Sequence, residues 1–382
     1  MIDNLSVGQV THLYRPSIGG IENYVHRLNQ STRNASHEAT TYTTDLSLES
    51  EESPLETDGA VQYCATTASL LRNPLSIELR RRVAASDHDV YHLHSPWFLP
   101  SLVAAQAIPD DAAVVMTVHS AQITSNSALV RALNTAYKPF AQYVFDRVDH
   151  SFVQGATENR RLLDRFDVAP ESVSIVPNGI HPAEYDVPDD AVRRFQAAYG
   201  LDPNIPTALF VSRLIPEKNP GVFVDAVTTE LDSREIQPVV VGTGEAEFVA
   251  TLRERGPDVT FLSNLEFAEL KAAYHAADLF VFLGTWEGLP TVILEAMNAR
   301  SPVIATPVGA IHDAVVDGEN GVTVSSPPSS EAVADAIRHY LDDPEHREAV
   351  GRRNRQLVHE EYAWDGVAEQ ILRKYKELVA RG

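Results

Sequence analysis

Two glutamates, Glu287 and Glu295, stand in a stretch of the chain whose residues suit the binding of a sugar. Glu287 lies in a glycine-rich turn after the apolar run 278–283, and Glu295 lies on the helix that Pro290 is expected to open, because proline suits the first helical position. In an open α/β sheet, the ends of the strands and the first turns of the following helices face one crevice. Carboxylates held there can accept hydrogen bonds from a ligand that carries many hydroxyls.

Two cationic residues, Arg213 and Lys218, flank a loop between a predicted strand and a helix that begins near Pro220. Arginine offers a planar fork and lysine a mobile point charge, a pairing that suits a diphosphate. Lysine is scarce here, since only five of the 31 basic residues are lysines. A surface ion pair with Glu217 is the alternative, and we favour phosphate binding.

Two glycine pairs follow other predicted strands. Gly19 and Gly20 join the first strand to a helix, and Gly242 and Gly244 flank Thr243 at a similar junction. Glycine lets a ligand approach the backbone closely, and a helix N-terminus offers free N–H groups to an anion. Plain tight turns are the alternative for both pairs, and a Gly-x-Gly turn alone is a weak signal.

The composition excludes several classes of protein. A net charge of −22 argues against nonspecific nucleic-acid binding and resembles that of proteins from salt-loving organisms. Cys64 is the only cysteine, so neither an intrachain disulfide nor a multi-cysteine zinc site can form. No apolar run of about 18 residues and no signal-peptide pattern occur, so we expect a cytoplasmic setting.

Short apolar runs alternate with amphipathic segments of helical length, which predicts repeated βα units with parallel strands covered on both faces. The predicted strands are 9–14, 40–44, 61–67, 90–94, 114–119, 151–154, 174–176, 207–213, 238–241, 259–262, 279–283, 303–305 and 322–324. A stretch rich in proline and aspartate, 177–206, divides the chain into two similar halves. Helices are expected after about residue 329.

As an ordered set, these motifs resemble the retaining glycosyltransferases of family 4, which have the GT-B fold. The segments that carry the resemblance are 19–22, 89–95, 117–119, 176–180, 212–214, 241–244, 277–281, 287–295 and 319–322. The resemblance implies an α/β protein with two Rossmann-like domains facing a central cleft and C-terminal helices packing back toward the N-terminal domain. The implied parts are an acceptor domain (1–185), a linker (186–206), a nucleotide-sugar domain (207–360) and a helix crossing back (361–382).

The resemblance also assigns roles. Glu287, His119, Arg213 and Lys218 would form the catalytic set, with the two cations on the donor's diphosphate, Glu287 on the transferred sugar and His119 reaching that sugar from the first domain. The implied donor-binding residues are Gly19, Gly20, Gly242, Gly244, Gly288, Leu289, Pro290, Thr291 and Glu295, of which Glu295 would accept hydrogen bonds from ribose. Asn178 would sit near the hinge.

The implied reaction moves a hexose-type sugar from a UDP- or GDP-linked donor to a hydroxyl acceptor, which could be a saccharide, a glycolipid or a lipid-phosphate-linked saccharide. Neither a metal nor a cofactor is expected. A sugar-nucleotide epimerase with the same fold and a noncatalytic carbohydrate-binding relative are the alternatives.

Four positions depart from the family pattern. Gly284 stands where serine is frequent, Arg300-Ser301 replaces a small residue and glycine, Ala310 replaces a second glycine, and His181 replaces an aspartate. These departures leave the fold intact but weaken any transfer of donor preference.

Other signals have plainer interpretations. Asp87-His88-Asp89 precedes a predicted strand, so we interpret it as the segment that leads into that strand and not as a metal-binding motif. His92 and His94 share one face of the same strand, but no third metal ligand lies near them in the sequence. The basic run 80–82 predicts a solvated helix face, and contact with a lipid phosphate is the alternative. Peripheral contact with a membrane therefore stays open.

Overall fold

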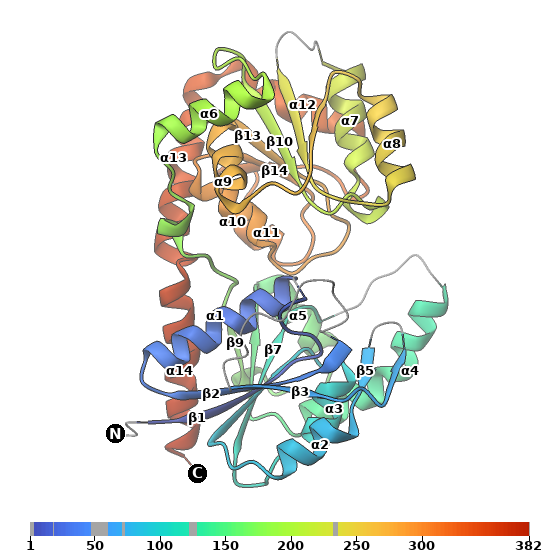
Figure 1. Cartoon of the computed structure of the whole chain (residues 1–382), viewed down its shortest axis with the longest axis vertical. Helices are drawn as coiled ribbons and strands as arrows, with labels where there is room; N and C mark the ends of the chain where they lie inside the picture. Colours follow the sequence, from blue (N-terminus) through green and yellow to red (C-terminus); the bar gives the residue numbers. More distant parts are fainter. Residues whose placement is uncertain are drawn as a thin grey trace. The chain divides into compact units, whose positions relative to one another are not determined.

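The computed structural model describes residues 4–17, 19–46, 60–70, 73–121, 128–231 and 236–381. The chain forms two compact units, drawn in Figure 1: the first holds Met1–Pro177 and Asp365–Gly382, and the second holds Asn178–Trp364. The chain therefore passes between the units twice.

The first unit is built on a parallel sheet of seven strands in the order β3-β2-β1-β6-β7-β8-β9. These strands are β1 (Ser6–Val10), β2 (Glu38–Thr44), β3 (Val61–Cys64), β6 (Val90–His94), β7 (Ala113–Val118), β8 (His150–Val153) and β9 (Val173–Ile175). Val10 on β1 pairs with Tyr42 on one side and Leu93 on the other, and the order of strands reverses between β1 and β6. A small antiparallel hairpin joins β4 (Ala68–Leu70) to β5 (Asn73–Leu75).

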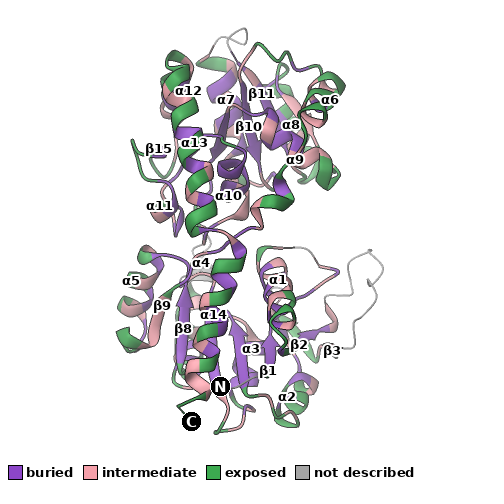
Figure 2. Ribbon diagram, turned by 90° about the vertical axis from the view of Figure 1, so that its left-hand side faces the viewer, coloured by how far each residue is buried: buried purple, intermediate pink, exposed green. Residues whose placement is uncertain are grey.

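Six α-helices accompany this sheet in the described residues: α1 (Gly20–Asn34), α2 (Ile77–Ala84), α3 (Leu99–Ala105), α4 (Ala128–Phe145), α5 (Ala156–Arg165) and α14 (Trp364–Val379). On α1 the buried residues Tyr24, Val25 and Leu28 recur at helical spacing, so one stripe of the helix is covered. Figure 2 shows the central strands of both sheets as buried, whereas the helices carry buried and exposed residues on different sides.

The second unit contains a parallel sheet of six strands in the order β12-β11-β10-β13-β14-β15. They are β10 (Thr207–Val211), β11 (Gln237–Val241), β12 (Thr260–Leu262), β13 (Leu279–Phe282), β14 (Val303–Ala305) and β15 (Gly321–Thr323). Leu209 pairs with Phe280, so β10 and β13 are neighbours, and the order of strands reverses between them.

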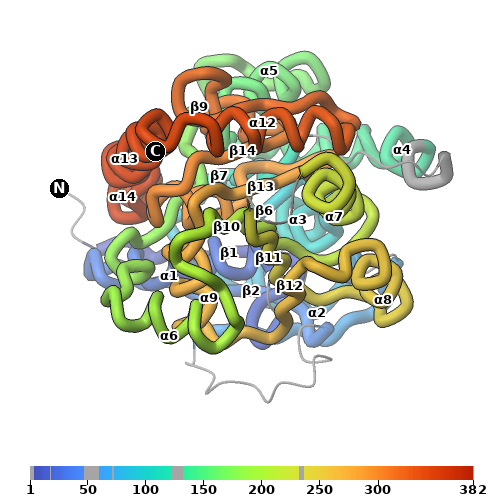
Figure 3. Tube along the Cα trace, turned by 90° about the horizontal axis from the view of Figure 1, so that it is seen from above, coloured from blue at the N-terminus to red at the C-terminus, as the bar shows by residue number. Residues whose placement is uncertain are grey.

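Helices cover both faces of this second sheet. They are α6 (Asp189–Tyr199), α7 (Pro220–Thr229), α8 (Ala246–Arg255), α9 (Phe267–Ala276), α10 (Thr291–Asn298), α11 (Ile311–Ala314), α12 (Ser330–Asp342) and α13 (Pro344–Glu361). Leu209 packs in one core with α9 and α10, and its neighbour Phe210 packs in another with α7 and α12. Figure 3 shows α6 and α9 on one side of these strands and α7 and α12 on the other. Both faces are buried, which explains the nearly continuous apolar runs.

The predicted fold class is confirmed, since both units are Rossmann-like α/β layers. The predicted strands match observed ones, although β1 ends at Val10 and not at Tyr14, and the hairpin β4–β5 was not expected. The first crossing between the units lies at 177–178, before the predicted linker. That linker contains α6, whose Phe195 is buried in the second unit's core. No helix in the described ranges has both the length and the apolar character needed to cross a membrane.

Candidate active site

The loops after β10 and β13 are joined by hydrogen bonds at the point where the strand order of the second sheet reverses. The side-chain amide of Asn219 donates to the carbonyl oxygen of Leu283 at 2.7 Å, and the backbone N–H of Thr285 donates to the carbonyl oxygen of Glu217 at 3.0 Å. Asn219 adopts a left-handed conformation, with φ of 51°, which asparagine tolerates better than most residues. Ligands of open α/β sheets bind at such a reversal point, outside the carboxyl ends of the strands.

Lys218 and Glu287 form an ion pair across these two loops. Only 15% of the lysine side chain and 16% of the glutamate side chain are exposed. The ammonium group also lies 5.4 Å from the ring centroid of Phe282. Burial lowers the pKa of Lys218 to about 8, and the positive charge of Arg213 acts in the same direction. A buried cation is therefore held by one carboxylate, which an anionic ligand could replace.

Arg213 is exposed, and its side chain makes no ion pair within the described ranges. It lies on the same loop as Lys218, five residues earlier, beyond the end of β10. The alternative in which Lys218 pairs with Glu217 is not observed, since its carboxylate partner is Glu287. Of the two cations assigned to the diphosphate, Arg213 is exposed, whereas Lys218 is paired with Glu287, the residue assigned to the transferred sugar.

The loop that carries Glu287 is closely packed against glycine. Gly309 has a φ of 57°, and a Cβ atom there would collide with the carbonyl oxygen of Glu287. A Cβ atom at Gly284 would lie 2.8 Å from the Phe282 ring and 2.9 Å from a carboxylate oxygen of Glu287. Glycine at 284 therefore leaves room for both neighbours, whereas a serine at this position would require one of them to shift. Ala310 is buried with a right-handed backbone, so no second glycine is needed there.

Gly242 and Gly244 allow the loops after β10 and β11 to touch. A Cβ atom on Gly242 would collide with the carbonyl oxygen of Ser212, and one on Gly244 with that of Leu214. The backbone N–H of Leu214 donates to the carbonyl oxygen of Thr243 at 2.7 Å. The glycines thus have a packing role, and they also line a cavity of about 330 Å³ together with Leu214, Arg253, Phe261 and Asn264.

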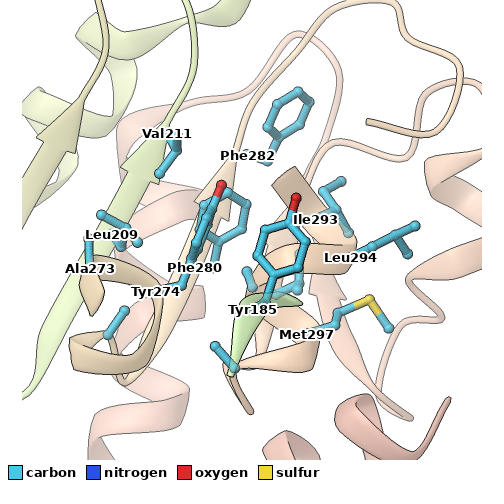
Figure 4. Packing of buried hydrophobic residues seen from close by; sticks show 14 of the residues in the cluster. Tyr185, Leu209, Val211, Ala273, Tyr274, Phe280, Phe282, Ile293, Leu294 and Met297 are labelled. Atoms are coloured by element: carbon cyan, nitrogen blue, oxygen red, sulfur yellow. The ribbon is translucent and has the colours of Figure 1, made fainter. Parts of the chain in front are cut away.

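Glu295 is 6% exposed and lies between two tyrosines. The hydroxyl of Tyr185 donates to Oε1 at 2.9 Å, and the hydroxyl of Tyr274 donates to Oε2 at 2.7 Å. Figure 4 shows both rings among buried side chains, with their hydroxyls pointing the same way. Burial, together with the charge of Glu295, raises the pKa of Tyr274 well above its usual value, so this phenol stays a donor. The sequence offered no signal for either tyrosine, because the contacts span 110 and 21 positions.

The remaining donor-site candidates of the second unit lie around the start of α10. The helix begins at Thr291, one residue after the predicted opening position, and Pro290 is its N-cap. The carbonyl oxygen of Gly288 accepts a hydrogen bond from Ala310, and that of Leu289 accepts one from Asn178 at 3.0 Å. Asn178 is the first residue after the crossing, so it ties the crossing segment to the Glu287 loop.

In the first unit, Gly19 is the N-cap of α1 and Gly20 is its first residue. Gly19 has an extended backbone, and a Cβ atom there would collide with the carboxylate of Glu22, which is buried. Nothing lies within 4 Å of a Cβ atom built on Gly20. The N-terminus of α1 is therefore open at Gly20 but has a carboxylate close to Gly19, with which an incoming anion would compete.

His119 follows β7 in the first unit and is half-buried. Its Nε2 atom lies 3.2 Å from Nδ1 of His94, and its ring meets Tyr24 edge-on at 5.0 Å. His92 and His94 share one face of β6, as predicted, with ring centroids 4.4 Å apart. Burial, followed by the charge of His12, lowers the pKa of His119 to about 3, so the imidazole is neutral.

Two residues of the Asp87-His88-Asp89 motif form hydrogen bonds within the first unit. Asp89 accepts from the backbone N–H of Ser6 at 2.8 Å and directly precedes β6. His88 bonds to the hydroxyls of Ser6 and Tyr42, at 2.6 and 2.9 Å. No group of three or more His, Cys, Asp or Glu side chains arranged to hold a metal ion occurs in the described part of the chain.

Two models of known protein families match the chain, one in each half. Residues 18–184 match the model described as "Glycosyltransferase Family 4", and residues 192–357 match that of "Glycosyl transferases group 1".

Among curated relatives, the uncharacterized glycosyltransferase MJ1607 of Methanocaldococcus jannaschii is 27% identical, over 55% of this chain and 55% of that protein. A D-inositol 3-phosphate glycosyltransferase of Corynebacterium glutamicum is 29% identical, over 63% of this chain and 60% of that protein. The matched region thus spans somewhat over half the length of these two relatives. A D-inositol 3-phosphate glycosyltransferase of Kineococcus radiotolerans is 28% identical, over 83% of this chain and 77% of that protein.

Solved structures show the same fold. Sucrose-phosphate synthase from Thermosynechococcus elongatus superposes with a TM-score of 0.81 at 20% identity, covering 99% of this chain and 100% of that one. Alr3699/HepE from Anabaena, in complex with UDP, has a TM-score of 0.81 at 18% identity and covers 98% of this chain and 100% of that one.

Proposed function

We propose that this chain, whose two halves match two glycosyltransferase family models, moves a hexose-type sugar from a nucleoside diphosphate sugar to a hydroxyl acceptor, with retention at the anomeric carbon. One observation carries the proposal. The Lys218–Glu287 ion pair lies at the reversal point of the second sheet, and Leu214, from the same loop as Lys218, lines a cavity together with Gly242 and Gly244.

The leaving diphosphate would be stabilised by the two cationic side chains of the loop after β10. Arg213 is exposed and always charged, and Lys218 is mostly buried, where the interaction of an ammonium group with an anion is less screened. Charged groups fixed before the reaction begins stabilise the charge that develops on a leaving group. Because the chain itself supplies this charge, we propose that transfer needs no metal, and turnover that is unchanged by EDTA would support this.

Donor binding would free Glu287. When the diphosphate pairs with Lys218, the carboxylate of Glu287 loses its partner and becomes an acceptor for hydroxyls of the transferred sugar. Glu295 would accept from the ribose. Each of its oxygens takes one hydrogen bond from a tyrosine, and a carboxylate oxygen has a second lone pair for a further donor.

The cavity of about 330 Å³ beside Gly242 and Gly244 is the proposed place of the nucleobase. It lies outside the carboxyl ends of β11 and β12, next to the strand whose loop carries the cations. UDP is the first donor nucleotide to test because the HepE structure holds it, and GDP is the second.

Retention would follow from attack on the same face as the departing diphosphate. We assign no side chain as a covalent nucleophile, and an oxygen of the leaving phosphate would take the proton of the acceptor hydroxyl. Proton NMR of the first product formed tests this assignment, because an inverted anomeric centre would rule it out.

The first unit would supply the acceptor side, with His119 on the transferred sugar and Gly20 near the donor phosphates. A lipid-linked acceptor is one candidate, and the basic run on α2 would then meet lipid phosphates. Arg82 bonds to Glu78 and Gln62, whereas Arg80 and Arg81 are exposed. Sedimentation with anionic liposomes that is lost in the variant Arg80→Ala/Arg81→Ala would support this contact.

The deciding experiment combines binding with transfer. Thermal unfolding with UDP, GDP and ADP should show a rise in melting temperature for one of them, because a ligand of the native state stabilises it. With the matching sugar nucleotide, Glu287→Gln should lower transfer by about a hundredfold while nucleoside diphosphate binding persists.

Glu319→Gln is the matched control, since Glu319 forms an exposed pair with Arg353 in the same unit. Absence of any nucleotide binding would overturn the proposal. A product sugar altered without any acceptor would instead identify an epimerase.

A further inference from the structure

Arg253 lines the cavity beside Gly242 and Gly244, and it forms no ion pair with a carboxylate in the described ranges. By contrast, Arg255, two positions later on α8, pairs with Asp225 of α7. The chain holds 53 acidic and 31 basic residues, so a carboxylate is the ordinary partner of an arginine in this protein. The cation of Arg253 is therefore a charged group beside a cavity that has no carboxylate to neutralise it.

The guanidinium group of Arg253 lies against Phe261 on β12, the edge strand of the second sheet. Its Nη2 atom donates to the carbonyl oxygen of Phe261 at 3.3 Å, and its Cζ atom lies 5.2 Å from the centroid of the Phe261 ring. A guanidinium group has five N–H donors and no acceptor. This carbonyl oxygen takes one donor, and the others form no hydrogen bond in the part of the chain that the structure describes. Arg253 therefore offers a ligand several oriented donors and no acceptor.

The remaining residues of the cavity suit a flat ring with a polar edge. The apolar residues Leu214, Val249 and Leu262 line it, together with the polar residues Ser263 and Asn264. Ligand pockets commonly combine apolar walls, which cover the body of the ligand, with a few polar groups that set its orientation. A nucleobase has apolar faces and an edge of hydrogen-bonding groups, so it matches this lining.

Arg253 lies away from the loops that would hold the phosphates and the ribose. The helix α8 begins at Ala246, and Arg253 follows seven residues later, which places it about 10 Å further along the helix axis. Helical side chains lean toward the N-terminus, so the guanidinium group reaches back into the cavity. In a pyrimidine base the ring position opposite the ribose is C4, and C6 corresponds to it in a purine. Arg253 is therefore placed to contact the group that this carbon atom carries.

We propose that Arg253 is a specificity-determining residue that selects donor nucleotides with an oxo oxygen at this position over those with an amino group. Uracil and guanine carry the oxygen, whereas cytosine and adenine carry the amino group. The oxygen accepts a hydrogen bond from the guanidinium group, but an amino group is itself a donor and would leave the arginine donors unpaired. This inference deepens the proposed function and rests on it, because the nucleobase must bind in this cavity.

The test compares the Kd values of matched nucleoside diphosphates in calorimetric titrations of the full-length protein. UDP and CDP differ only at C4 and the adjacent ring nitrogen, and inosine diphosphate and ADP differ in the same way at C6. Both members of a pair carry the same ribose and diphosphate, so the ratio of their Kd values depends on the base alone. We expect the oxo member to bind about tenfold more tightly in each pair that binds.

Arg253→Met should bring these ratios to about one, because methionine keeps an apolar side chain and has no donor. Arg253→Gln should also lower them, since its amide oxygen can accept a hydrogen bond from an amino group. Thermal unfolding without nucleotide shows whether each variant is folded, and Arg253→Gln provides the result if Arg253→Met does not fold. Arg255→Met is the matched control, because Arg255 lies on the same helix but does not line the cavity, and its ratios should equal those of the wild type.

Two results would contradict the inference and leave the proposed function intact. The first is equal affinity of the wild type for the two members of each pair. The second is an Arg253→Met variant that binds all four nucleotides more weakly with unchanged ratios, which would assign Arg253 to the phosphates or to the fold. If the wild type binds none of the four nucleotides, the proposed function itself fails, and the inference fails with it.

Discussion

The hydroxyl of Tyr274 donates a hydrogen bond of 2.7 Å to Oε2 of Glu295, in a part of the second unit where both side chains are buried. The tyrosine lies on α9 and the glutamate on α10. This contact joins the helix before β13 to the helix after it, and so fixes the direction of the carboxylate that we assign to the ribose.

Tyr274→Phe should therefore destabilise the second unit. The change leaves one oxygen of a buried carboxylate without its donor, which costs about 1–3 kcal/mol. Denaturant unfolding measures the cost. Tyr199→Phe is the matched control, because Tyr199 donates to Glu269 at 3.1 Å in a partly buried setting, and it should cost less. Equal losses in the two variants would contradict the importance of burial.

Lys218 makes the affinity for nucleoside diphosphate depend on pH. Its pKa of about 8 lies below the ordinary value of 10.5, so the free protein loses this cation as the pH rises through about 8. Affinity should then fall above about pH 8 in calorimetric titrations, by up to about tenfold per pH unit.

The same lysine also affects stability. The unfolded chain keeps the proton up to about 10.5, so between about pH 8 and 10.5 this group makes the folded state more stable as the pH rises. Lys218→Arg should abolish both dependences, because a guanidinium stays charged. An affinity in Lys218→Arg that falls as in the wild type would assign the pH dependence to another group.

Gly309→Ala should displace the Glu287 loop. The new Cβ atom would collide with the carbonyl oxygen of Glu287, and the backbone there has a φ of 57°, which alanine adopts at a cost. A small displacement of a ligand-binding group can lower turnover by about a hundredfold. Gly366→Ala is the control, since a Cβ atom on Gly366 meets nothing within 4 Å. Transfer at the wild-type rate in Gly309→Ala would show that this close contact is unimportant.

Arg300→Gly should stabilise the protein slightly. Arg300 has a φ of 67° just after α10, a position where glycine avoids the strain of a side chain. Relief of that strain, less the entropy lost by glycine on folding, should add about 1 kcal/mol or less in thermal unfolding. Asn264→Gly, at a φ of 52°, should gain less because asparagine tolerates this conformation. A lower melting temperature for Arg300→Gly would refute the explanation.

Salt should stabilise the whole protein. The chain holds 53 acidic and 31 basic residues, so its net charge is strongly negative and self-repulsion opposes folding. Screening by KCl weakens that repulsion, and the melting temperature should rise between low and molar salt. A melting temperature that stays flat or falls with added salt would show that self-repulsion does not limit the stability of this protein.

Much of the fold followed from the sequence for a clear physical reason. Strands covered on both faces are apolar at every position, as Leu209 and Phe210 show by packing into different cores. The hairpin β4–β5 escaped prediction because β4, from Ala68 to Leu70, is exposed along its whole length and has no apolar pattern.

The site was predictable as a set of residues but not as a set of contacts. The order of the motifs identified Lys218 and Glu287, yet no local rule joins two side chains that lie 69 positions apart. The partners of Glu295 and of His94 were missed for the same reason. Such pairs depend on which strands become neighbours, and that depends on the order of strands in each sheet.

The double passage of the chain between its units changes how fragments of this protein should be made. Residues 178–364 are one uninterrupted stretch, so the second unit can be expressed by itself from a single gene segment. The first unit cannot, because a stop codon after residue 364 removes a helix that buries Tyr375 against its sheet. An isolated first unit would need residues 365–382 rejoined to residue 177 through an added spacer.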